Sequence, residues 1–113
     1  MLTQGRRIKR IDFPSYKDQK TTWNGGVLRI SCYRRIEKNT HTRFTVVVSK
    51  KNYQTISGRN RFKRRVFSVI SGLLGDFDQT IFDRFVILPT KKVEDITFSE
   101  IQNDIRSLIS ASI

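Results

Sequence analysis

The sequence predicts an α+β (α/β sandwich) fold, with helices packed on a β-sheet in a single domain of 113 residues. Three segments rich in β-branched and aromatic residues predict strands, at 27–33, 43–49 and 84–88. Two segments with apolar residues at helical spacing predict helices, one from Ser57 and one from Thr97. Strands and helices therefore alternate in the second half, which favours helices lying on a sheet.

The strand predictions rest on local composition. The segment 27–33 (VLRISCY) follows Gly25-Gly26 and alternates apolar with polar residues. The segment 43–49 (RFTVVVS) is the strongest strand signal, because its apolar run is nearly continuous. We expect these two segments to form a hairpin closed by a long polar turn. The third segment, RFVIL, is closed by Pro89.

Each helix prediction combines a cap with an apolar face. Ser57 is a suitable N-cap for a helix that runs to Leu74 and ends at Gly75, followed by a loop over 75–83. Thr97-x-x-Glu100 is a capping box that begins the last helix. The apolar positions that repeat along one face are Phe62, Val66, Val69, Ile70 and Leu73 in the first helix and Phe98, Ile101, Ile105, Leu108 and Ile109 in the last.

The N-terminal segment differs in composition from the rest of the predicted domain. Residues 1–26 are polar and broken by Pro14, so we expect an N-terminal arm or short helix before a compact core over 27–113.

Cys32 is the only cysteine, which excludes a disulfide framework and favours a reducing cytoplasm. No stretch has the length or apolar character of a membrane span, so we expect no membrane partner.

The charge is large and unevenly distributed. The chain carries a formal net charge of +12. Residues 1–65 hold 18 Lys and Arg against 3 Asp and Glu, whereas residues 66–113 hold 4 against 7. Such an excess repels itself unless a polyanion is bound, so the charge predicts a nucleic-acid partner for the first half and a scaffold in the second.

The basic residues concentrate at the start of the first predicted helix. Like charges at i, i+4 spacing repel, which phosphate contacts would relieve. A solvated basic helix face is the alternative. Aromatic residues among the cations could stack on bases, with core packing as the alternative for each: Phe13, Tyr16, Trp23 and Tyr33. The predicted RNA contacts are Lys50, Lys51, Arg59, Asn60, Arg61, Lys63, Arg64 and Arg65.

Residues suited to protein-based catalysis are scarce. His41 is the only histidine, so a histidine pair or cluster is excluded. Asp76, Asp78 and Asp83 could hold a hydrated Mg²⁺, but aspartates in such a loop more often serve the turn. We therefore expect no protein metal site. An autonomous metal-dependent nuclease is the hypothesis that the sequence favours least.

The run RFTVVVSKKNYQTISGRNRFKRRV resembles the protein subunit of bacterial ribonuclease P. That family has a strand ending in Ser/Ala-Lys-Lys, a short linker and an Arg-Asn-Arg motif that opens a basic helix. Ser49-Lys50-Lys51 and Arg59-Asn60-Arg61 supply these parts here. The resemblance implies a four-stranded mixed sheet in the order α-β-β-β-α-β-α, with Pro14 favouring a reduced N-terminal helix.

The resemblance also implies a function. The protein would bind the catalytic RNA of ribonuclease P and help it to remove the 5′ leader of precursor tRNA, as the accessory subunit of an RNA enzyme. The Mg²⁺ ions would be held mainly by the RNA, and no other protein partner would be obligatory. Phe13, Tyr16 and Tyr33 are the candidates for leader binding. The alternative is a non-catalytic structural RNA-binding protein, such as a ribosomal protein.

Overall fold

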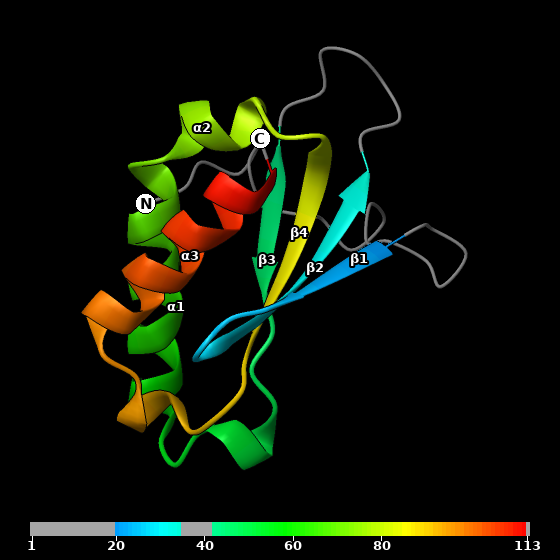
Figure 1. Cartoon of the computed structure of the whole chain (residues 1–113). Helices are drawn as coiled ribbons and strands as arrows, with labels where there is room; N and C mark the ends of the chain where they lie inside the picture. Colours follow the sequence, from blue (N-terminus) through cyan, green and yellow to red (C-terminus); the bar gives the residue numbers. More distant parts are fainter. Residues whose placement is uncertain (1–19, 35–41, 113) are drawn as a thin grey trace.

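The computed structural model describes residues 20–34 and 42–112. Figure 1 shows one twisted sheet with α1 and α3 lying along one side of it. The predicted α+β architecture, a four-stranded mixed sheet covered by helices, is confirmed. The elements are β1 (Lys20–Asn24), β2 (Leu28–Arg34), β3 (Arg43–Val46), the 3₁₀ helix η3 (Lys50–Asn52), α1 (Ile56–Ser71), α2 (Leu74–Asp78), β4 (Phe82–Pro89), the 3₁₀ helix η4 (Val93–Asp95) and α3 (Phe98–Ser112).

The sheet order is β1-β2-β4-β3. Strand β4 is antiparallel to β2 and parallel to β3. The predicted hairpin between the segments 27–33 and 43–49 is therefore wrong, because β4 lies between them. Side chains on both faces of β4 are buried, Phe85 and Ile87 on one and Val86 on the other, and such a strand is suited to the middle of a sheet.

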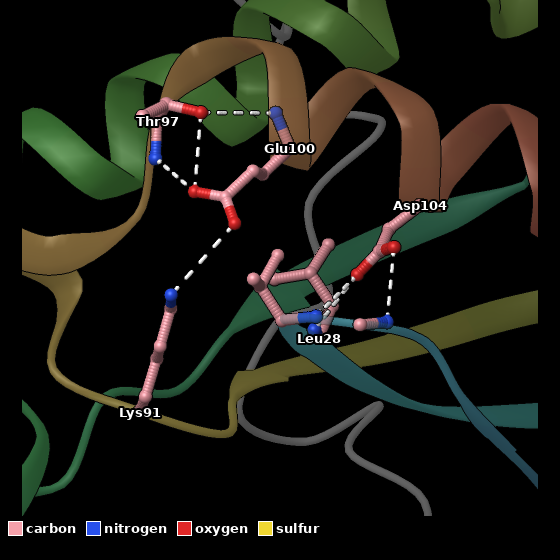
Figure 2. A network of polar contacts seen from close by, with 7 residues as sticks. Leu28, Lys91, Thr97, Glu100 and Asp104 are labelled. Atoms are coloured by element: carbon pink, nitrogen blue, oxygen red, sulfur yellow. Dashed lines mark hydrogen bonds and ion pairs between the residues drawn. The ribbon is translucent and has the colours of Figure 1, made fainter.

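Strand β1 forms within the segment that the sequence assigns to an N-terminal arm. It pairs antiparallel with β2 and places Trp23 against the core. The turn between the two strands is held by Asp104 of α3, whose carboxylate accepts hydrogen bonds from the backbone N–H groups of Gly26, Val27 and Leu28 at 3.1, 2.8 and 2.9 Å (Figure 2). The expected N-terminal helix falls in residues 1–19, outside the described residues.

Helix α1 begins earlier than predicted. Thr55, not Ser57, is the N-cap, because its Oγ1 accepts a hydrogen bond of 2.9 Å from the N–H of Gly58. The helix ends at Ser71, with Gly72 as its C-cap. The predicted apolar face is confirmed: Phe62, Val66, Val69 and Ile70 are buried, and Leu73 beyond the helix packs against the same core.

The segment predicted as a loop over 75–83 is only partly a loop, because its start lies in the short helix α2 and its last two residues lie in β4. Phe77 explains this helix. Its ring meets Phe44 of β3 and Phe85 of β4 edge to face, with centroids 4.8 and 5.1 Å apart. Burial of one aromatic ring against two others stabilises a turn of helix that Gly75 by itself would disfavour.

Helix α3 begins with the predicted capping box. The N–H of Thr97 donates to Glu100 Oε1 at 2.9 Å, and the N–H of Glu100 donates to Thr97 Oγ1 at 3.2 Å (Figure 2). Lys91 Nζ lies 3.7 Å from the other carboxylate oxygen of Glu100. Ile101, Ile105, Leu108 and Ile109 are buried as predicted, whereas Phe98 remains 41% exposed at the start of the helix.

Candidate nucleic-acid interface

The solvent face of α1 carries two of the predicted cations, together with the predicted Asn60. Phe62 and Val66 are buried at 2% and 0% exposure and fix the opposite face of the helix to the core. Asn60, Arg61 and Arg64 are exposed and lie within about one helical turn of one another. Because the buried face fixes the helix, these side chains project from a rigid support.

Arg59 departs from this arrangement. Its guanidinium lies over the ring of Tyr53, 5.6 Å from the centroid, so it turns toward the linker before the helix. Its Nε is buried and has no hydrogen-bond partner among the described residues. Lys63 and Arg65 are half-buried along the two edges of the exposed face. The outermost cations of the motif are therefore Arg61 and Arg64.

The predicted lysine pair lies in η3, directly after β3. Lys50 and Lys51 are exposed. Ser49 Oγ donates to Asn52 Oδ1 at 2.8 Å, and Asn52 Nδ2 donates to the carbonyl of Lys91 at 3.4 Å. These bonds hold the turn that presents both lysines at the end of the sheet.

A cavity of about 390 Å³ opens beside Lys51. Arg29 of β2 lines it, and this residue was not predicted. Arg29 is an exposed position in a strand whose neighbours Leu28 and Ile30 are buried, so its side chain lies on the sheet face away from α1. Asn24 Oδ1 accepts a 3.1 Å hydrogen bond from Arg29 Nε and fixes it. The lining residues are Arg29, Ser49, Lys51, Asn52, Leu88, Pro89 and Thr90.

This cavity combines groups that suit a nucleotide. Arg29 and Lys51 supply positive charge for a phosphate, and Leu88 and Pro89 supply an apolar surface. Helix α1 and the cavity lie on opposite faces of the sheet, and the lysine pair lies in the chain between β3 and α1, with Lys51 lining the cavity. The three parts, which are the exposed residues of α1, the lysine pair and the cavity, are named here the sheet-end surface.

Tyr33 lies away from the sheet-end surface. It pairs with Arg84, whereas Arg29 pairs with Leu88, so the two positions are four residues apart along β4 and roughly 13 Å apart. Tyr33 is only 9% exposed, and the guanidinium of Arg84 lies over its ring at 5.4 Å. The other leader-binding candidates, Phe13 and Tyr16, lie outside the described residues.

Other reactive groups contribute little to this surface. Burial raises the pKa of the Cys32 thiol to about 12, so the thiol stays protonated. Asp78 accepts a hydrogen bond from the N–H of Thr42, and Asp83 pairs with Arg84. Within residues 20–34 and 42–112, no group of three His, Cys, Asp or Glu side chains could hold a metal ion. In the same ranges, no helix is long and apolar enough to cross a bilayer.

Comparison with known proteins shows the family of the chain. The family model of ribonuclease P matches residues 2–112. The chain belongs to the ribonuclease P protein family. It is thus a subunit of ribonuclease P, a ribonucleoprotein of tRNA processing, and it works with an RNA component. None of the curated proteins compared with the chain matches it.

Solved structures of ribonuclease P proteins share the fold. A Staphylococcus aureus RNase P protein mutant with defective mRNA degradation activity is 19% identical, with a TM-score of 0.76 over 96% of this chain and 88% of that one. A second S. aureus RNase P protein is 20% identical, with a TM-score of 0.72 over 94% of each chain. The Thermotoga maritima RNase P protein in complex with 1-(4-fluorophenyl)-2-thiourea is 18% identical, with a TM-score of 0.65 over 80% of this chain and 84% of that one.

Proposed function

We propose that this ribonuclease P protein binds the catalytic RNA through α1 and the lysine pair, and binds the 5′ leader of precursor tRNA at the cavity beside them. The observation that carries this proposal is the sheet-end surface. It comprises a rigid helix face with exposed cations and a cavity of about 390 Å³ on the other face of the sheet. One protein can therefore contact two RNA segments at once.

In this proposal the protein is an accessory subunit, and cleavage belongs to the RNA. Arg61 and Arg64 neutralise phosphates of the catalytic RNA, and Asn60 contacts a base edge or a ribose hydroxyl. The Mg²⁺ ions that serve the reaction are bound mainly by that RNA. Neutralising phosphates close to the cleavage site would let fewer Mg²⁺ ions suffice. We place this reaction in the cytoplasm.

Reconstitution tests the proposal. The full-length protein is added to a bacterial ribonuclease P RNA and a precursor tRNA at low Mg²⁺, with no other protein present. We expect a mature 5′ end only when both protein and RNA are present. Cleavage by the protein alone would support an autonomous nuclease. Recovery of ribosomal RNA in place of ribonuclease P RNA from cells would support a ribosomal protein.

The leader assignment has a separate test. Arg29→Ala should reduce the preference of the reconstituted enzyme for precursor tRNA over mature tRNA, because only the precursor has a leader to occupy the cavity. Arg106→Ala removes the same charge from an exposed site on α3 and serves as the control. If both variants reduce the preference equally, the effect is one of overall charge and the cavity does not bind the leader.

A further inference from the structure

The connection between β4 and α3 contacts the linker that joins the lysine pair to α1. Glu94 of η4 makes the main contact. The N–H of Gln54 donates to both of its carboxylate oxygens, at 3.1 and 3.0 Å, and the N–H of Thr55 donates to Oε2 at 3.2 Å. A fourth bond in the same region runs from Asn52 to the carbonyl of Lys91. The linker is thus anchored to a segment about 40 residues away in the chain.

Glu94 lies on a turn that is packed into the core, and its carboxylate reaches the first turn of α1. Its neighbours Val93 and Ile96 are buried at 4% and 3% exposure, so η4 is fixed in the core. On the other side, Gly58 in the first turn of α1 leaves room for the carboxylate. A Cβ atom at position 58 would overlap Glu94 Oε2. The glycine and the glutamate are therefore sterically matched.

The charge of Glu94 is unexpected at this place. A carboxylate against the linker and the start of α1 repels the phosphates that this surface is proposed to bind. Burial acts to raise its pKa, but the hydrogen bonds from Gln54 and Thr55 and the charge of Lys92 outweigh this effect and lower the pKa below the ordinary value. Glu94 is therefore ionised at neutral pH, and its electrostatic effect on RNA binding is unfavourable.

We infer that Glu94 is a positioning residue, which fixes the lysine pair and the basic helix α1 in the relative orientation that RNA binding requires. This inference rests on the proposed function. Backbone N–H groups of the linker need a fixed acceptor, and an ionised carboxylate accepts several such bonds at once. The benefit of a fixed linker exceeds the phosphate repulsion that the carboxylate introduces.

The sign of one mutational effect tests this inference. Glu94→Gln removes a negative charge and keeps the side-chain length, but it replaces one acceptor oxygen by an amide donor. If Glu94 acted only through its charge, this variant would bind ribonuclease P RNA more tightly. We expect it to bind more weakly, by about fivefold to eightfold at 0.1 M salt, which corresponds to the misplacement of one phosphate contact.

Asp95→Asn is the matched control. It removes one negative charge from the same turn, and Asp95 makes none of the bonds to the linker. We expect its affinity for RNA to equal or slightly exceed that of the parent. The two variants have the same net charge, so a difference in their affinity for RNA reports the hydrogen bonds between Glu94 and the linker and not the charge.

Gly58→Ala provides an independent way to displace the carboxylate. Alanine raises helix propensity by up to about 1 kcal/mol over glycine, which offsets the close approach of its Cβ to the N-cap oxygen Thr55 Oγ1 at 3.0 Å. We expect Gly58→Ala to weaken RNA binding as Glu94→Gln does. The double variant should be little worse than either single variant, because both changes break the same contact.

A readout without RNA completes the test. The amide proton shifts of Gln54 and Thr55, measured by ¹H–¹⁵N NMR on the full chain, should move in Glu94→Gln and Gly58→Ala and stay unchanged in Asp95→Asn. Unchanged shifts in Glu94→Gln, or RNA binding by this variant at or above the parental affinity, would overturn the inference. If the parent fails to bind ribonuclease P RNA, the proposed function fails, and the shifts still report whether Glu94 holds the linker.

Discussion

Removing one exposed guanidinium from α1 is expected to weaken RNA binding by a calculable factor. Arg61 and Arg64 are both exposed, and their helix face is opposite the buried Phe62 and Val66. Each can therefore reach one phosphate without moving the helix. Each phosphate contact contributes a slope of about −0.9 to the dependence of log K on log salt.

The magnitude follows from that slope. At 0.1 M salt, the loss of one contact corresponds to about eightfold in affinity, or about 1.2 kcal/mol. We expect this loss for Arg61→Ala and again for Arg64→Ala, and about sixtyfold for the double variant if the two contacts are independent. For contacts to single-stranded RNA the slope is about −0.7 per contact, and the loss of affinity for each single variant falls to about fivefold.

The assay is a salt titration of binding to ribonuclease P RNA, by filter binding or fluorescence anisotropy. Each single variant should reduce the magnitude of the slope by about 0.9, the contribution of one phosphate contact, and the double variant by about twice as much. Arg106→Ala on α3 is the control of equal charge. If its slope and affinity change as much as those of Arg61→Ala, the RNA responds to net charge alone, and the assignment of α1 as the contact surface is refuted.

Three further predictions concern the scaffold. Asp104→Ala should lower the free energy of unfolding in urea by about 3 kcal/mol, because three backbone N–H groups lose a charged acceptor; a loss below about 0.5 kcal/mol would contradict this. Hydrogen bonds from Thr97 lower the pKa of Glu100 below its ordinary 4.5, so its contribution to stability is present above that value and is lost as the pH falls through the lowered pKa. In Glu100→Gln, stability should therefore fall less between pH 5 and pH 3 than in the parent, as measured by thermal unfolding at each pH. Cys32, with its raised pKa of about 12, should react with iodoacetamide only when the protein unfolds, and rapid alkylation under native conditions would contradict its burial.

The sequence predicted those features that depend on local pattern. Helix α1 was located by Phe62 and Val66 at helical spacing, and α3 by the Thr97–Glu100 capping box, because both signals lie within a few residues. The N-cap of α1 was misplaced by two residues. Thr55 and Ser57 are both good caps, and the choice depends on Glu94, which holds the N–H of Thr55 from a distant part of the chain.

Features that depend on distant partners were not predicted. The hairpin between the segments 27–33 and 43–49 was wrong because alternation reveals a strand but not its neighbour, and β4 occupies the place between them. Strand β1 was missed because it is polar except for Trp23, and Asp104 of α3 holds its turn. Arg29 was missed for the same reason, since only the pairing of β2 with β4 brings it beside Leu88 and the cavity.

The position of β4 has a consequence for the order of events during synthesis. Residues 1–65, with 18 basic and 3 acidic residues, leave the ribosome before residues 82–89, yet β3 joins the sheet through β4. A nascent chain that has just exposed its basic helix therefore has no completed sheet to support it. Such a segment attracts any nearby RNA through charge alone. We therefore expect selective binding to begin only when β4 has inserted between β2 and β3, so the newly made protein would pass from indiscriminate to specific recognition as its C-terminal third emerges.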